Sequence, residues 1–258
     1  LPLPLNSFLC LRSSWLVGTR PAGADGRVGQ GLDARLMALM AVLLAASSAL
    51  VVPSVQAQAD PQAHITASEA SLSNFLRDPD MSWLQQNFSR AKAVIISPEI
   101  VKAGFIFGGS GGRALVVARD PKSGKWVGPA FYALATASVG FQAGLSVSEG
   151  VTLVMTDKGF NSLLSASFKM GGDASVAAGP VGAGAKSNIV ADLITFNRAK
   201  GVYGGLNFDG TVMTVSDDWN ATFYGKKVQP TDIFVRMDVH NKAADKLLAQ
   251  VTAAANKK

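Results

Sequence analysis

One serine of this chain sits in a pattern that serine hydrolases use. The run Gly108-Gly109-Ser110-Gly111-Gly112 matches G-x-S-x-G, in which the serine hydroxyl attacks a carbonyl carbon. That chemistry needs the serine at a sharp strand-to-helix turn and a histidine that accepts its proton. Residues 113–118 are strand-like instead, and the only histidines after residue 59 are His64 and His240. We therefore interpret the five residues as a glycine-rich hairpin turn.

The other patterns that suggest chemistry either have the wrong residue spacing or lack the residues that the chemistry needs. Residues 179–187 imitate a phosphate-binding loop but lack the glycine that must come directly before the lysine. His64 and His240 are isolated, and no acidic series has the spacing of a Ca²⁺ loop. We expect His240 to be a packed core residue, because it falls on an apolar helical stripe. Cys10 is the only cysteine, so residues 60–258 have no thiol chemistry. The sequence predicts no enzyme, no cofactor and no metal.

Positive charge is in mild excess and is scattered along the chain. The full chain has 24 Lys and Arg against 18 Asp and Glu, a formal net charge of +6. Residues 1–59 contain four arginines and two aspartates, so their removal leaves +4. Nucleic-acid binding is disfavoured because it needs cations gathered in a patch or stripe. A mild excess favours an anionic surface, such as that of a phospholipid membrane.

Three segments differ in composition. Residues 1–34 are rich in Pro, Gly and Arg without periodicity, and we interpret them as an extension that is disordered or precedes the true start. Residues 35–59 combine an arginine, an apolar run and a small-x-small end, which are the parts of a signal peptide. An uncleaved anchor is the alternative, but the run ends at Pro53 and is short for a span of ~20 residues. Cleavage near Ala59 predicts a single domain, 60–258, that is periplasmic or secreted.

The apolar runs between residues 91 and 215 are short, β-prone and separated by glycine or proline. Apolar residues at helical spacing mark residues 61–77 and 81–88, and again the segment that begins at Thr231 and passes through Met237 and His240. The N-terminal helices either pack on the sheet or lie on a membrane, and amphipathic stripes usually face a core. The pattern predicts an α+β fold: an antiparallel, barrel-like or strongly curved sheet of seven to nine strands, with amphipathic helices at the N- and C-termini.

Seven fragments in this chain resemble the SYLF domain, and they occur in that family's order. The resemblance covers about residues 91–251, and the Gly108–Arg113 run departs from the family pattern, which often has a bulkier residue there. The fragments are Ala91-Lys92 with Ile95–Pro98; Lys102-Ala103-Gly104-Phe105 with Phe107-Gly108-Gly109; Trp126 with Pro129-Ala130-Phe131; Gly140-Phe141-Gln142-Ala143-Gly144; Ala178-Gly179-Pro180-Val181-Gly182; Lys200-Gly201-Val202-Tyr203-Gly204-Gly205; and Asp218-Trp219-Asn220 with Tyr224-Gly225.

The resemblance implies non-catalytic binding of phospholipid or a similar amphipathic ligand at the bacterial cell envelope. Eukaryotic SYLF proteins bind phosphoinositides and actin, neither of which is expected in a periplasm. Many bacterial members are lipoproteins, whereas this chain has no cysteine after its apolar run to accept a lipid.

Cations beside the family fragments are the candidates for contact with anionic headgroups, and helix 61–88 is the candidate for insertion among acyl chains. For each cation alone, a solvated surface position is the alternative. The competing function is a structural or protein-interaction module of the periplasm with no specific lipid ligand. The candidate lipid-binding residues are Lys92, Lys102, Arg113 and Lys200.

Overall fold

A computed structural model describes residues 60–257 apart from 105–106, 140–143, 183, 185–187 and 200–207. Residues 1–59 lie outside the described part, so the predicted leader stays a prediction. Four helical segments come first: α2 (Pro61–Arg77), η1 (Pro79–Met81), α3 (Ser82–Asn87) and η2 (Phe88–Arg90). The strands and later helices are β1 (Ala93–Gly104), β2 (Phe107–Arg119), β3 (Trp126–Val139), β4 (Gly144–Val154), α4 (Asp157–Leu163), β5 (Ser167–Lys169), β6 (Val176–Ala178), β7 (Leu193–Ala199), β8 (Val212–Val215), α5 (Asp217–Tyr224), α6 (Pro230–Phe234), η3 (Lys242–Ala244) and α7 (Asp245–Asn256).

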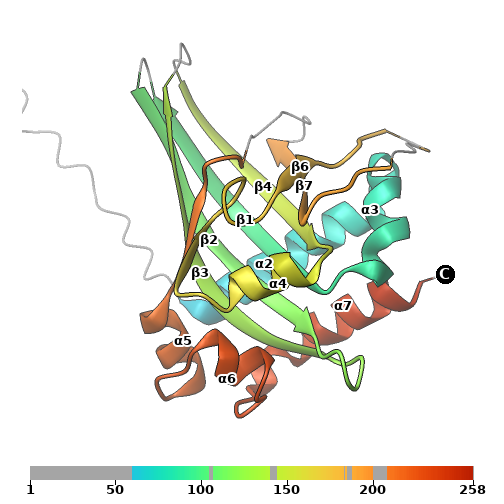
Figure 1. Ribbon diagram of the computed structural model, residues 1–258, viewed down its shortest axis with the longest axis vertical. Helices are drawn as coiled ribbons and strands as arrows, with labels where there is room; N and C mark the ends of the chain where they lie inside the picture. The colour runs from blue at the N-terminus through green and yellow to red at the C-terminus, as the bar shows by residue number, and fades with distance from the viewer. Residues whose placement is uncertain are drawn as a thin grey trace, which may run out of the picture. The chain divides into compact units, whose positions relative to one another are not determined.

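The eight strands form one curled sheet in the order β5-β8-β3-β2-β1-β4-β7-β6 (Figure 1). The predicted α+β class and strand number are confirmed. The pairing is antiparallel, as predicted, except between the edge strands β6 and β7, which run parallel. β1 changes register against both neighbours around Pro98. Proline has no backbone N–H to donate to a ladder, which accounts for an irregularity at that residue.

The glycine-rich run is strand and not turn, which corrects the hairpin prediction. Gly108–Gly112 lies within β2 and pairs with β1 on one side and β3 on the other. Lack of space for a side chain explains why glycine occupies these positions. A Cβ on Gly112 would lie 2.5 Å from the Glu99 carbonyl oxygen, and a Cβ on Gly109 would lie 3.0 Å from the Thr136 carbonyl oxygen. The glycines allow close backbone approach beside the β1 irregularity. β1 ends at Gly104 and β2 begins at Phe107, and residues 105–106 between them lie outside the described part.

Helices cover both faces of the sheet. We call one the α2 face, since α2, α3, α5 and α7 pack there on alternate strand residues that include Val94, Leu115, Phe131, Val151 and Phe196. The other is the α4 face, where α4 and α6 pack on the intervening residues, among them Ile95, Val116, Tyr132, Val154 and Met213. This alternation is the period of two that strands impose on side chains.

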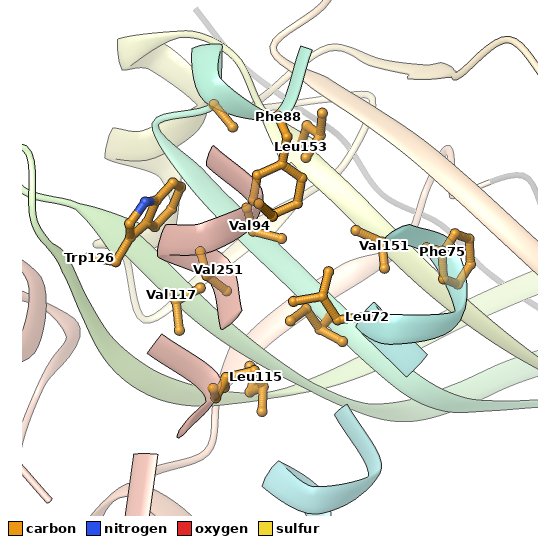
Figure 2. Packing of buried hydrophobic residues seen from close by; sticks show 14 of the residues in the cluster. Leu72, Phe75, Phe88, Val94, Leu115, Val117, Trp126, Val151, Leu153 and Val251 are labelled. Carbon is orange, nitrogen blue, oxygen red and sulfur yellow. The ribbon is translucent and has the colours of Figure 1, made fainter. Parts of the chain in front are cut away.

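The apolar stripe of α2 is buried in this core. Ile65, Leu72 and Phe75 are at most 2% exposed, and Figure 2 shows Leu72 and Phe75 packed with Val151 of β4. Packing on the sheet is therefore confirmed for this helix, and its use as an insertion element is not, because its apolar side chains already have partners. Among the residues described here, no helix is both long enough and apolar enough to cross a bilayer.

The single C-terminal helix predicted from Thr231 is wrong. The segment forms two helices, α6 and α7, and the chain between them turns at Met237, whose φ of 55° is left-handed. That backbone conformation ends a right-handed helix. His240 is consequently not in the core: it is exposed, and its Nε2 lies 3.1 Å from an Asp245 carboxylate oxygen.

Gly179 is a position where the sheet edge tolerates no side chain. A Cβ there would lie 2.1 Å from Cζ of Phe196, which is 1% exposed and has no room to move. We expect Gly179→Ala to lower the free energy of unfolding by about 1–3 kcal/mol through overpacking. Urea unfolding measures this change. Gly172→Ala is the control, because its Cβ would meet only the flexible Lys169 side chain, and a cost equal to that of Gly179→Ala would contradict the steric account.

Candidate functional site

A pocket of about 360 Å³ opens where β1 begins and β2 ends. Three separate segments build it: residues 90–92, which lead into β1; residues 119–124, which form the turn from β2 to β3; and the first turns of α4. The lining residues are Arg90, Ala91, Lys92, Arg119, Asp120, Pro121, Gly124, Asp157 and Phe160. We call this the basic pocket, because three of its five ionisable groups are cations.

Contacts within the chain hold the cations of the basic pocket in place. The Arg119 guanidinium donates to the carbonyl oxygens of Gly124 and Ser89, each at 3.1 Å. The Arg90 guanidinium donates to Asn87 Oδ1 at 2.9 Å. Lys92 Nζ lies 2.8 Å from Asp157, and the two side chains are 42% and 81% exposed. Such an exposed pair is worth about 0–1 kcal/mol, so separating Lys92 from Asp157 costs little.

The other acid of the pocket is occupied by its own turn. The Asp120 carboxylate accepts hydrogen bonds from Ser123 Oγ at 2.5 Å, Ser123 N at 2.9 Å and Lys122 N at 3.2 Å. These hydrogen bonds, that from the Ser123 hydroxyl foremost, lower the pKa of Asp120. Because both carboxylate oxygens accept hydrogen bonds from within the turn, Asp120 fixes the shape of the turn that forms this wall of the pocket. The walls also include Pro121 and Phe160, so cations and apolar carbon lie side by side.

Further lysines surround the pocket. Lys122, Lys125 and Lys158 are exposed on the same turn and the same helix that line it. With the three lining cations they make six positive groups, against the carboxylates of Asp120, Asp157 and Asp192. Asp192 is itself held by the Thr156 and Ser175 hydroxyls. This end of the sheet therefore holds a local excess of positive charge that the sequence shows only as scattered residues.

The predicted lipid-binding residues do not form one site. Only Lys92 lies in the basic pocket. Lys102 lies ten residues further along β1, roughly 30 Å away at the rise of an extended strand. Arg113 faces the α2 face, where its guanidinium stacks 4.1 Å from the centre of the Trp219 ring and donates to Ser216 Oγ at 2.8 Å. Lys200 falls outside the described residues.

Lys102 and Arg113 project from opposite faces of the sheet. Lys102 shares its face with Ile100, a member of the α4-face core, whereas Arg113 precedes Ala114 of that core and therefore points the other way. One flat membrane cannot contact both through the same face. Sequence reasoning missed the pocket residues Arg90, Arg119 and Phe160. The sequence signal that could have indicated them is the group of cations around Asp120-Pro121, a dipeptide typical of turns.

No catalytic arrangement assembles in the described part of the chain. Ser110 lies within β2 on the α4 side, as the alternation from Ala114 shows, while His64 packs against Phe131 and Trp219 on the α2 face. His240 lies beyond α6, outside both cores. Within the described ranges there is also no group of three or more His, Cys, Asp or Glu placed to hold a metal ion. The nucleotide-like run 179–187 is described only in part.

The described part of the chain thus combines a curled sheet with a basic pocket that has apolar walls. Residues 135–254 match the Ysc84 family, described as "Las17-binding protein actin regulator". The chain is 29% identical over 150 residues to human SH3 domain-containing YSC84-like protein 1, a match that covers 56% of this chain and 43% of the human protein. It is 33% identical over 143 residues to LAS seventeen-binding protein 3 of Saccharomyces cerevisiae, covering 53% and 31%.

The matched region, residues 135–254, is a SYLF-type domain of the Ysc84 family. Protein YSC84 of Saccharomyces cerevisiae is a further relative, 31% identical over 143 residues. The names of these relatives indicate binding and regulation rather than catalysis, which supports a non-catalytic binding module. The chain spans less than half the length of the relatives it matches.

Proposed function

We propose that this chain binds anionic phospholipid, or a similar amphiphile that carries a phosphate, at the bacterial cell envelope, and that the basic pocket is where the phosphate is held. The observation that carries the proposal is the convergence of Arg90, Lys92 and Arg119 on one pocket with Phe160 in its wall. Guanidinium groups bind phosphate oxygens through paired N–H donors, and lysine adds a mobile point charge.

The pocket suits a surface-bound ligand better than an enclosed one. A volume of about 360 Å³ accommodates a headgroup and the start of its acyl chains. The surrounding lysines extend the positive field beyond the pocket, and each cation near an anionic bilayer adds about 1 kcal/mol of attraction. The predicted signal peptide supports the envelope as the location.

Removal of two pocket charges tests this proposal. We expect Arg90→Gln combined with Lys92→Gln to weaken binding to phosphatidylglycerol vesicles roughly 30-fold, because two cations at about 1 kcal/mol each are lost. Co-sedimentation of residues 60–258, and of the full chain in parallel, measures the affinity. Raising the salt concentration from about 0.05 to 0.5 M should also weaken vesicle binding by the unmodified protein, because salt screens the electrostatic attraction.

The matched control removes the same charge from the opposite part of the sheet. Lys102→Gln with Lys169→Gln also lowers the net charge by two, but Lys102 pairs with Ser110 in mid-sheet and Lys169 with Val212 at the edge. We expect a much smaller loss from this pair. Equal losses for the two double variants would show that only net charge matters and that the basic pocket has no special part.

The structural or protein-interaction module remains the second candidate, and one observation favours it. β1–β4 run past the helices at one end of the sheet (Figure 1), and Leu145 there is 71% exposed. An apolar residue on an uncovered strand suits a protein partner. A photo-crosslinking group at position 145 tests this: adducts with envelope proteins, together with no binding of the unmodified chain to any vesicle, would favour the second candidate over the first.

A further inference from the structure

We propose that the segment Val235–Asp238, which follows α6, is the apolar element that enters the membrane beside the basic pocket; this inference rests on the proposed function. Val235 is 54% exposed and Met237 is 44% exposed, although the two residues before them, Ile233 and Phe234, are buried. The chain thus emerges from the core and immediately presents two large apolar side chains to solvent.

The exposure does not come from a loosely held loop. Val235 N and Arg236 N both donate to the Thr231 carbonyl oxygen, at 3.1 and 2.9 Å, and Asp238 N donates to the Asp232 carbonyl oxygen at 2.9 Å. Met237 is the only non-glycine residue with a positive φ in the described part of the chain. A methionine held in that conformation is strained, yet the residue remains 44% exposed. Binding to something outside the chain would account for it.

Charge in this segment is compatible with an anionic surface. Arg236 forms ion pairs with the carboxylates of both Asp232 and Asp238, the latter at 3.2 Å from Nε. Its single positive charge offsets one of the two carboxylates, and residues 226–238 as a whole carry a net charge of +1, because Lys226, Lys227 and Arg236 outnumber Asp232 and Asp238. Lys226 and Lys227 are exposed in the turn that leads from α5 to α6. Apolar residues flanked by cations are the composition of interfacial membrane anchors.

The segment and the basic pocket belong to the same end of the sheet. Phe160 lines the pocket, and its ring centre lies 6.5 Å from that of Phe234, the residue directly before Val235. α6 and the turn from β2 to β3 lie at the end of the sheet away from the projecting strand tips (Figure 1). In this arrangement the basic pocket holds the phosphate, while Val235 and Met237 enter the acyl region to a depth of about 5–10 Å. The two contacts together form one amphipathic membrane-binding surface.

Substitution at Met237 separates membrane contact from folding. We expect Met237→Gly to weaken binding to phosphatidylglycerol vesicles about tenfold, the equivalent of one large apolar side chain. Glycine adopts a φ of 55° freely, so the thermal midpoint should stay the same or rise. Met237→Asn, a polar residue that tolerates the left-handed region, should weaken binding similarly. Leu145→Asn is the matched control, because it removes an exposed apolar residue from the other end of the sheet.

A fluorescent probe reports the insertion directly. Cys10 is the only cysteine, so Met237→Cys in residues 60–258 places one thiol for an environment-sensitive dye. We expect blue-shifted emission on addition of phosphatidylglycerol vesicles, and none for the same dye at Leu145→Cys. If the vesicles bind but the dye at 237 stays in water, or the dye at 145 shifts instead, this inference is overturned and the proposed function stands. If the unmodified chain binds no vesicle, both are overturned.

Discussion

Arg198→Met is expected to lower the free energy of unfolding by about 3–5 kcal/mol, the cost of leaving a buried carboxylate without its partner. The Arg198 guanidinium forms an ion pair with Glu149 and lies 3.7 Å from Asp78. The side chains of the three residues are only 17–23% exposed. Ser71 of α2 donates to the second oxygen of Glu149 at 2.5 Å. The network therefore joins α2 and the start of η1 to β4 and β7.

Urea unfolding of two further variants separates the ion pair from simple loss of packing. Glu149→Leu combined with Arg198→Met removes both charges of the closer pair, and we expect it to be more stable than Arg198→Met alone, because the Glu149 carboxylate is no longer left without its partner. Asp78 loses Arg198 in both variants and keeps the hydrogen bond from Asp80 N. Lys92→Met is the surface control; its pair with Asp157 is exposed, and its loss should cost less than about 1 kcal/mol. Similar losses for Lys92→Met and Arg198→Met would contradict the account.

Acid is expected to destabilise the protein through His64. Burial, and secondarily the charge of Arg113, lower the pKa of His64 from 6.5 to about 4. Its Nε2 is buried and has no hydrogen-bond partner among the described residues, and the ring packs edge-on against Trp219 at 5.4 Å between centres. Burial therefore disfavours the charged form of this ring.

The sign of the pH dependence follows from proton uptake. Between pH 6.5 and 4 the unfolded chain holds a proton on His64 that the folded protein does not, so stability falls as the pH falls through this window. The contribution is fully present above pH 6.5 and lost by pH 4. A shift of this size corresponds to roughly 3 kcal/mol.

Unfolding at several pH values in parent and variant isolates this contribution. We expect His64→Leu to lose about 3 kcal/mol less than the parent between pH 6.5 and 4, because leucine takes up no proton. His240→Leu is the matched control: His240 is exposed and paired with Asp245, so its replacement should leave the steep pH dependence in place. Parallel curves for the parent and His64→Leu would refute the assignment to His64.

Local pattern was sufficient for the class of fold and for the family. Alternating apolar residues with glycine and proline between them predicted a curved sheet of seven to nine strands, because strand period and turn chemistry depend on near neighbours. The amphipathic stripe of residues 61–77 predicted α2 for the same reason. The ordered fragments from Ala91 to Gly225 predicted the SYLF family, which the comparison with the Ysc84 family confirms.

Local pattern failed where the outcome depended on a distant partner. The Gly108–Gly112 run looked like a turn, yet its glycines serve close contact with β1 and β3. The stripe continuing past Thr231 looked like one helix, yet the chain turns at Met237, and His240 is exposed in consequence. Neither the strand neighbours nor the left-handed residue can be read from periodicity.

Patterns among near neighbours were enough to predict the sheet, the buried stripe of α2 and the family. Which cations lie together depends on the tertiary structure. Lys92 is joined by Arg119, 27 positions later, because β1 and β2 are antiparallel and bring the start of one beside the end of the other. Lys102 and Arg113, much closer in sequence, are separated because the irregularity at Pro98 resets which side chains share a face. Strand register, which long-range packing sets, therefore determines the site.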